Sequence, residues 1–375
     1  MKTMQHKWRM ISFSLGLFAI LFWGCGEKSG GETADGTVDV VTNDSLGDSA
    51  SVENRIRNLT EQLRFSKTNW ELYMERSKLW YEAGNIPQAM ADIDRAIENH
   101  IMGPENYYLK GFYYYAQRQD SEATRQLRKA VDLGSEDPET YYLLGQLRYL
   151  AKDYTGADNW YNTAISLDSM QPTYYFAKGY LAQTQERFDE AIEIYRVALQ
   201  RDPTFVKVLL ALHDIYLNVK KDADQAFAFN ERVILVDSTQ PVARFNQGNF
   251  FMARANILTE EEELVEFQVL IKIAISEYNR CLEVDPNYVE AYYNRGYCFF
   301  LLNQFGPALN DFSTVIELDA FNDRAFFMKA SIQEVQGDMV SALENYRQAV
   351  RINPQFRDAE KAVKELSLKL KAQTG

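Results

Sequence analysis

Apolar residues recur at helical spacing along most of the chain. In the stretch 138–168, Tyr141 and Leu144 share one face of a first predicted helix, and Ala157 and Tyr161 share one face of a second. Spacings of three, four and seven residues are typical of amphipathic α-helices. The pattern therefore predicts a pair of helices joined by a short turn.

The helix pair is repeated with a period of 34 residues. The alanine at 157 has counterparts one step away at Ala123 and Ala191, and the glycine at 145 has counterparts at Gly111 and Gly179. A hairpin of two amphipathic helices cannot bury its apolar faces alone, but stacked copies bury a continuous core. The repeat therefore predicts an extended array of hairpins.

Over roughly residues 70–354 the pattern resembles the tetratricopeptide repeat family. The small residue of the second helix is alanine in every unit: Ala89, Ala123, Ala157, Ala191, Ala226, Ala274, Ala308 and Ala342. The resemblance implies an all-α fold, a right-handed superhelical solenoid of about eight helix hairpins. We expect units at 70–103, 104–137, 138–171, 172–205, 206–240, 241–288, 289–322 and 323–354, with capping helices at 51–69 and 355–375 because solenoid ends need cover.

Two units depart from the pattern. In the fifth, His213 replaces the glycine of the first helix, which we interpret as a distorted packing position without chemistry. The sixth carries an insert of 14 residues, in which Thr259 and Glu262 have the spacing of a capping box. We expect its second helix to run over 260–284 and its first to extend through 252–258. Such a hairpin either docks a partner or simply packs on the array.

The first 24 residues have a basic start and then an apolar run, 10–23, that is too short to span a bilayer. With Gly24 before Cys25 they resemble a bacterial lipoprotein signal peptide. The resemblance implies a lipid, including palmitate, on Cys25. Because Gly26 follows rather than aspartate, it also implies anchoring in the outer membrane, facing the periplasm. The alternative is a secreted or uncleaved anchored protein in which Cys25 is incidental. The polar residues 26–50 predict a disordered tether.

Paired aromatic residues recur in the first helices. By the family's positions, the concave groove is expected to be lined by Tyr108, Phe112, Tyr115, Tyr142, Tyr149, Phe176, Tyr180, Phe245, Tyr293, Tyr297, Phe300 and Phe327. In the third unit we expect Tyr141 to be structural and Tyr142 to face a partner. Rigid rings suit an extended peptide or an inserted helix, and they also stack on sugars. The alternative is that neighbouring repeats bury some of these rings.

Composition restricts the function. A net charge of −13 and a pI near 4.9 argue against nucleic acid as a partner. Three cysteines and three histidines are too few and too scattered for a metal cluster or a disulfide framework. No catalytic or cofactor motif is recognisable, and Met74 and Lys78 do not match the family's Lys/Asn carboxylate clamp. The sequence predicts a membrane-anchored scaffold for a protein partner in the cell envelope, with a saccharide-binding lipoprotein as the alternative and an enzyme as the least favoured class.

Overall fold

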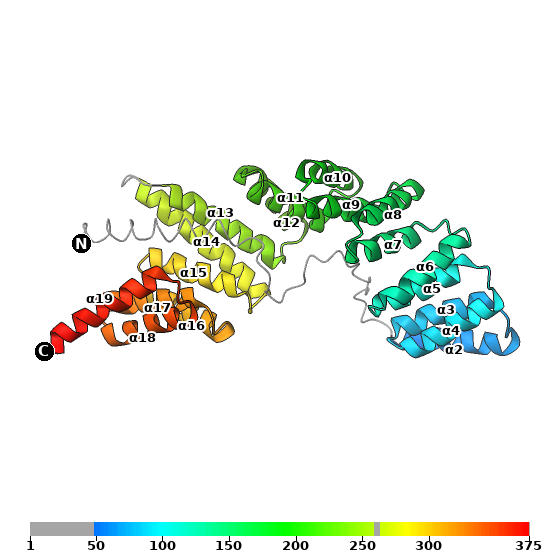
Figure 1. Ribbon diagram of the computed structural model, residues 1–375, viewed down its shortest axis with the longest axis horizontal. Helices are drawn as coiled ribbons and strands as arrows, with labels where there is room; N and C mark the ends of the chain where they lie inside the picture. The colour runs from blue at the N-terminus through cyan, green and yellow to red at the C-terminus, as the bar shows by residue number, and fades with distance from the viewer. Residues whose placement is uncertain (1–48, 259–262, 375) are drawn as a thin grey trace. The chain divides into compact units, whose positions relative to one another are not determined.

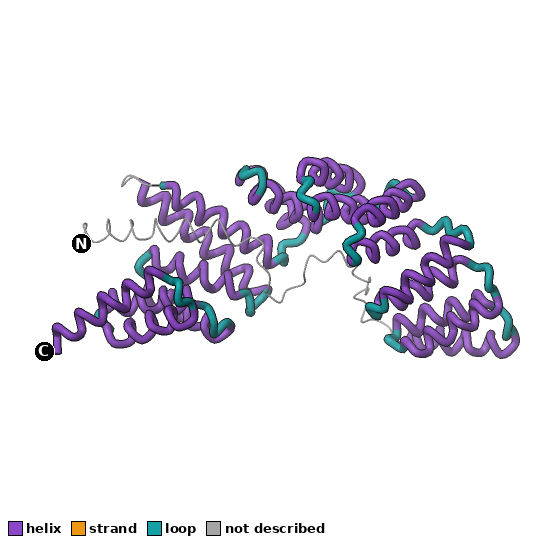
Figure 2. Tube along the Cα trace, viewed as in Figure 1, coloured by secondary structure: helices purple, strands orange, loops and turns teal. Residues whose placement is uncertain are grey.

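The computed structural model describes residues 49–258 and 263–374, which form eighteen helices and no strand. Figures 1 and 2 show successive helices running back and forth as hairpins. The all-α prediction is confirmed over these residues. The predicted signal peptide, Cys25, most of the tether 26–50 and the capping-box pair Thr259 and Glu262 lie outside the described residues.

The described helices fall into two compact units, 49–208 and 209–374. The N-terminal unit contains α2 (Ser49–Phe65), α3 (Trp70–Glu82), α4 (Ile86–Asn99), α5 (Pro104–Ala116), α6 (Asp120–Asp132), α7 (Pro138–Leu150), α8 (Tyr154–Leu167), α9 (Pro172–Thr184) and α10 (Phe188–Arg201). The boundary lies within α11 (Val206–Asn218), in the repeat that carries His213.

The C-terminal unit contains most of α11 and the helices that follow it. They are α12 (Ala223–Val236), α13 (Pro241–Ile257), α14 (Leu264–Val284), α15 (Val289–Leu301), α16 (Phe305–Leu318), α17 (Asp323–Gln336), α18 (Met339–Ile352) and α19 (Arg357–Thr374). Within each unit, consecutive helices such as α15 and α16 pack against each other.

Side chains at the helix ends fix the turn within each hairpin. In the third repeat, Lys152 takes a left-handed backbone conformation, φ 59°. Asp153 then caps α8 by accepting a hydrogen bond from the backbone amide of Gly156 at 3.0 Å. At the start of α7, Pro138 occupies a position whose amide has no helical partner, so proline is tolerated there. Local sequence thus sets where the two helices begin and end.

The small residues of the first helices lie where an aromatic ring of the second helix crosses. A Cβ atom added to Gly145 would come within 2.4 Å of the Tyr161 ring, and one added to Gly179 within 2.5 Å of the Tyr195 ring. In the fifth repeat a larger, polar residue stands at this place and bonds across the hairpin: the imidazole Nδ1 of His213 lies 2.9 Å from the carbonyl oxygen of Ala226. His213 is buried, as a packing position requires.

The insert lengthens the hairpin of the sixth repeat. Helix α13 has 17 residues and α14 has 21, whereas α7 and α8 of the third repeat have 13 and 14. The extension of the first helix is confirmed as far as Ile257. The described part of α14 begins at Leu264, and the predicted start at residue 260 lies outside the described residues. Ile257 and Val265, near the tip, are 75% and 74% exposed.

A polar contact recurs at the seam where neighbouring repeats meet. A residue on the first helix of a repeat bonds to the residue sixteen positions earlier, which lies on the preceding helix. We call this contact a seam bridge. Five seam bridges join Arg76 to Thr60, Lys110 to Asp94, Lys178 to Asn162, Arg295 to Asn279 and Lys329 to Ser313.

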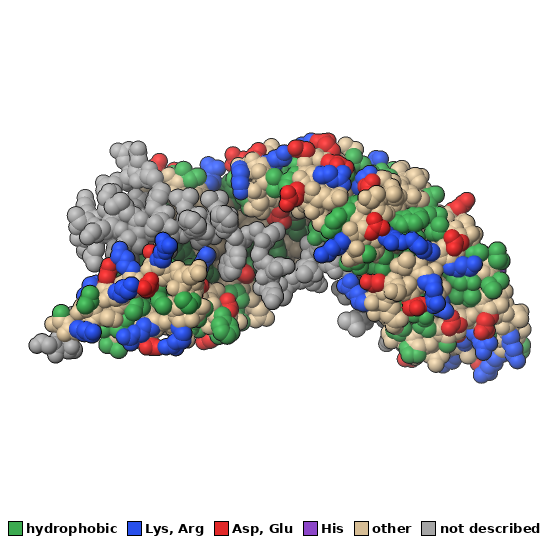
Figure 3. Space-filling view, in the orientation of Figure 1, with side chains coloured by type: hydrophobic (Ala, Val, Ile, Leu, Met, Phe, Trp, Pro, Cys, Tyr) green, Lys and Arg blue, Asp and Glu red, His purple; other side chains and the backbone are tan. Residues whose placement is uncertain are grey.

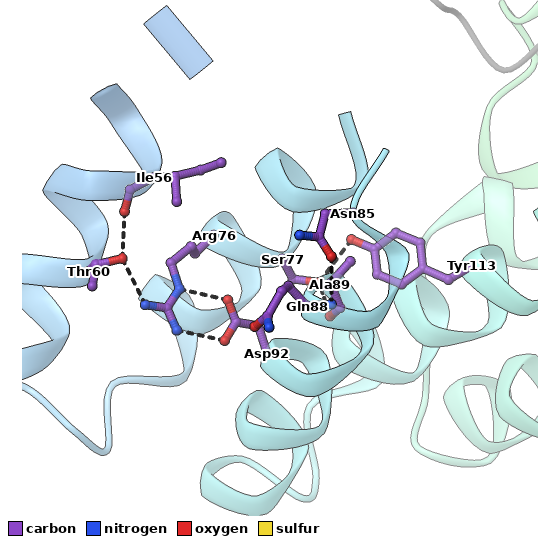
Figure 4. A network of polar contacts seen from close by, with 9 residues as sticks. All are labelled: Ile56, Thr60, Arg76, Ser77, Asn85, Gln88, Ala89, Asp92 and Tyr113. Atoms are coloured by element: carbon purple, nitrogen blue, oxygen red, sulfur yellow. Dashed lines mark hydrogen bonds and ion pairs between the residues drawn. The ribbon is translucent and has the colours of Figure 1, made fainter. Parts of the chain in front are cut away.

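Arg76 and Arg295 extend this bridge into their own hairpins. In Figure 4, Arg76 donates two hydrogen bonds of 2.7 Å to the Asp92 carboxylate, and its third goes to Thr60 at 3.0 Å. Arg295 binds Asp311 in the same bidentate way, at 2.8 and 2.6 Å. Bidentate pairs of this kind combine charge with fixed geometry, so they fix the two helices of one hairpin against each other, while the bond to the preceding helix joins that hairpin to its neighbour. The cap helix α2 thus meets the first repeat through the contact that repeats use with one another.

Candidate partner-binding surfaces

In the N-terminal unit, five aromatic rings form a continuous row. Tyr149 contacts Tyr154 and Tyr180 at centroid distances of 5.9 and 5.8 Å, Tyr180 contacts Phe176 at 6.1 Å, and Phe176 contacts Phe205 at 5.6 Å. We call these five residues the ring row. All five are half-buried, so each keeps part of its surface accessible. The row joins α7, α8, α9 and the turn before α11.

Tyr108 and Phe112 belong to the same unit and are also half-buried. The Phe112 ring lies 5.4 Å from that of Tyr81, at the end of α3. These two residues therefore add partly accessible aromatic surface on α5, next to the first repeat.

Three of the predicted groove residues are in the core instead. Tyr115, Tyr142 and Phe327 are only 6%, 3% and 8% exposed. The Phe327 ring is held between those of Tyr346, at 5.3 Å, and Phe356, at 4.9 Å. The prediction that these three side chains face a partner is wrong, because helices of the same and the next hairpin cover them.

Of the two roles expected for the tyrosine pair of the third repeat, the structural role of Tyr141 is confirmed and the partner-facing role of Tyr142 is wrong. Tyr142 packs between Tyr161 of its own hairpin, at 6.1 Å, and Tyr174 of the next, at 5.3 Å. Burial raises the pKa of its hydroxyl. Tyr141 is half-buried and donates a hydrogen bond of 2.7 Å to the backbone oxygen of Ser135. The Tyr142 ring inserts into the seam between repeats, which the periodicity of a single helix does not reveal.

The structure adds rings that the sequence reasoning missed. Tyr154 and Phe305 are the first residues of second helices, and Phe205 and Tyr288 lie in the turns before first helices. Each contacts a predicted groove residue: Phe305 lies 6.1 Å from Phe300, and Tyr288 lies 5.0 Å from Phe245. An aromatic residue recurring at these two places in the repeat was a signal that could have found them.

The C-terminal unit has its own half-buried aromatic residues. Phe245, Tyr293, Tyr297 and Phe300 all keep some exposed surface, and Tyr297 lies 6.3 Å from Phe300. Burial raises the pKa of Tyr293 to about 12, so its hydroxyl stays protonated at neutral pH and can donate a hydrogen bond. Nine of the twelve predicted residues thus remain partly accessible, in two separate sets.

Two carboxylates lie at the N-terminal end of α7, beside the aromatic residues. The Tyr174 hydroxyl donates a hydrogen bond of 2.7 Å to Glu139, and the Asp137 carboxylate accepts one from the Glu139 amide at 3.2 Å. Burial raises the pKa of both carboxyls. Their charges also contribute to the raised pKa of Tyr108. The aromatic surface around Tyr108 is therefore acidic.

Elsewhere on the described surface, charges of both signs are mixed. Figure 3 shows Lys and Arg side chains interspersed with Asp and Glu over the face in view, with hydrophobic side chains between them. Many of the exposed charges are paired along one helix, as Arg196 and Glu193 are on α10 at 2.6 Å. Such exposed pairs contribute little to stability and do not mark a site.

Other candidate chemistry is sparse in the described residues. Cys281 and Cys298 are buried free thiols, and burial raises the pKa of Cys281 to about 12, which keeps it protonated. Across 49–258 and 263–374, no group of three or more His, Cys, Asp or Glu side chains could hold a metal ion. Over the same residues, none of the helices combines the length and apolar character needed to cross a membrane.

Models of tetratricopeptide repeats match four stretches of the chain: residues 108–169, 172–205, 277–306 and 302–355. These stretches are tetratricopeptide repeats. Within these stretches, the hairpins, the crossings at Gly145 and Gly179 and the alanines of the second helices are therefore the family's packing scheme.

Similar proteins share the repeats over part of their length. The chain is 25% identical over 185 residues to Tetratricopeptide repeat protein 13 of Homo sapiens, a match that covers 47% of this chain and 19% of that protein. It is 27% identical over 173 residues to Hsp70-Hsp90 organizing protein 3 of Arabidopsis thaliana, covering 46% of this chain and 26% of the other. The chain spans about a quarter or less of the curated relatives it matches here.

A solved structure supports the fold. The C-terminal part of a TPR repeat-containing protein from Cytophaga hutchinsonii superposes with a TM-score of 0.53 at 17% identity. The superposition covers 68% of this chain and 98% of that one. At this identity the likeness concerns the helical repeat fold alone.

Proposed function

We propose that this chain is a non-enzymatic scaffold that binds a protein or peptide partner on the half-buried aromatic residues of its repeats. The observation that carries the proposal is the ring row, whose five rings keep accessible surface although the neighbouring tyrosine Tyr142 is fully packed. Rings of this kind offer large contact area at little cost in side-chain entropy, and they are enriched in binding hot spots.

The acidic end of the surface adds to its specificity. Glu139 and Asp137 have hydrogen-bond partners but form no ion pair among the described residues. A partner segment with apolar side chains, ending near these carboxylates in a polar or basic group, would satisfy both parts of the surface.

Site-specific photocrosslinking in the native cell tests the scaffold. A photoreactive residue in place of Tyr180 should trap one discrete protein, whereas the same residue in place of the exposed Glu193 on α10 should not. A purified form of the trapped protein should then bind the wild-type chain and lose affinity for Tyr149→Ala. No discrete product from position 180, or the same product from position 193, would refute the proposal.

We also propose that the chain is tethered to the cell envelope by lipid on Cys25, in the outer membrane and facing the periplasm, where it helps assemble an envelope complex. The support is the sequence pattern alone: a basic start, a short apolar run and Gly24 before Cys25. Metabolic palmitate labelling should be lost in Cys25→Ala. Labelling that persists in this variant would exclude the anchor and leave the scaffold proposal untouched.

A further inference from the structure

A pocket of about 310 Å³ opens between α6, α7 and α8 of the N-terminal unit. Arg128 of α6 and Arg148 of α7 line it together with Asp153, Asn159, Trp160 and Thr163 from α8 and its N-cap. These helices lie next to one another in the array shown in Figure 1. The pocket lies at the seam between the second and third repeats.

The pocket lies at one of the seams that have no seam bridge. By the sixteen-residue spacing of the five seam bridges, the third repeat should pair residue 144 with residue 128. Residue 144 is a buried leucine, so it cannot bond to the arginine at 128. In the hairpins of Arg76 and Arg295, the residue sixteen positions later is an aspartate that pairs with the arginine. In the third repeat, the residue sixteen positions after Leu144 is Trp160. The third repeat therefore replaces the charged contact with an indole and an open space.

The loss of the bridge leaves a cation without a partner. Arg128 forms no hydrogen bond or ion pair with any described residue, and its side chain lies at the surface of α6. Arg148 reaches Asp153 only loosely, at 3.6 Å. A guanidinium carries five N–H donors in a planar fork that matches a carboxylate. The lining thus has one more positive than negative charge, in a chain whose net charge is −13.

The remaining groups favour a ligand with hydroxyls and a flat apolar face. The half-buried Trp160 ring packs on Tyr141 at 5.8 Å and offers its indole to the pocket. The Asp153 carboxylate is an acceptor, and the Asn159 amide is both donor and acceptor. Sugar hydroxyls need donors and acceptors together, whereas a simple carboxylate needs donors only.

From this combination we infer that the pocket binds a carboxylated sugar residue. The sugar ring packs on Trp160, its hydroxyls bond to Asp153 and Asn159, and its carboxylate pairs with Arg128. The site is separate from the ring row: at about 100° per residue, Arg148 points away from Tyr149, the residue that α7 contributes to the row, by more than a quarter turn. The inference therefore does not depend on the proposed protein partner.

Titration of the full chain with three small probes tests the inference. Saturation-transfer NMR would give the Kd of glucuronate, of the neutral sugar glucose and of the acyclic dicarboxylate succinate. We expect glucuronate to bind about two- to fivefold more tightly than either, since Arg128 is exposed and an exposed ion pair is worth up to about 1 kcal/mol. Arg128→Gln should raise the Kd of glucuronate by about two- to fivefold.

The adjacent Lys129 provides the control, because Lys129→Gln makes the same change of charge on the same helix outside the pocket lining. This variant should leave the Kd unchanged. Equal binding of glucose or succinate, no measurable binding of glucuronate, or an equal loss in both variants would overturn the inference. Circular dichroism of both variants checks that the helices are retained, and crosslinking from Tyr180 remains an independent test of the scaffold.

Discussion

Replacing Tyr142 by alanine tests whether this side chain belongs to the core of the third repeat. Its side chain is 3% exposed and is enclosed by the Tyr161 and Tyr174 rings. Removing a buried aromatic ring costs about 3–5 kcal/mol, which combines lost burial with the cavity that remains. The half-buried Tyr149 makes ring contacts with Tyr154 and Tyr180, so its replacement should cost about 1–3 kcal/mol at about 0.5–1.5 kcal/mol per aromatic pair.

Urea unfolding followed by circular dichroism would measure both losses. Because repeat arrays can unfold in parts, hydrogen exchange of the amides in α7 and α8 gives the local value. Tyr142→Phe keeps the ring and removes the hydroxyl, which bonds to Gln146, so it should cost about 1 kcal/mol. If Tyr142→Ala were no more destabilising than Tyr149→Ala, or if exchange in α7 and α8 did not increase, the assignment of Tyr142 to the core would be wrong.

Three further predictions concern packing, charge and pH. Gly179→Ala should destabilise the N-terminal unit by about 1–3 kcal/mol in urea unfolding, because its new methyl group would overlap a buried tyrosine ring. Gly306→Ala, which meets no atom within 4 Å, should not destabilise. Asp311→Ala should cost about 3–5 kcal/mol by leaving the Arg295 cation largely buried and unpaired, whereas the double change with Arg295→Met should recover most of this loss in a double-mutant cycle. Because burial raises the pKa of Glu139 above 4.5, the folded state holds that proton more tightly than the unfolded chain, and stability falls as the pH rises through the raised value. The melting temperature should therefore fall less steeply between about pH 4 and about pH 8 in Glu139→Gln than in the wild type. If both proteins had the same dependence of melting temperature on pH, Glu139 would not have a raised pKa in the folded state.

Local sequence predicted the helices well because their signals are local. Apolar residues at helical spacing, a side-chain cap such as Asp153 and a proline such as Pro138 each act within one or two turns. The repeated small residues also have a local reason, since Gly145 leaves room for the Tyr161 ring of its own hairpin. The same signals predicted a longer first helix in the sixth repeat, and α13 has that greater length.

The accessible surface was predicted less well, because accessibility depends on the next repeat. Tyr141 and Tyr142 are chemically identical neighbours, and helical periodicity only says that they point in different directions. The choice between them is made by Tyr174, which lies on α9 in the next repeat and whose ring closes over Tyr142. A pattern read within one helix does not contain that contact.

The sequence by itself determined that this protein is built from helix hairpins in a 34-residue repeat, and that the hairpin of the sixth repeat is longer than the others. Only the tertiary structure decided which aromatic rings stay accessible and which seams form a polar bridge. The physical reason is that these features arise between hairpins, where side chains on successive repeats must meet. The Lys178–Asn162 contact forms at one seam, whereas the buried Leu144 cannot form the corresponding contact at the seam before it. The row of rings and the pocket beside Arg128 both result from that packing.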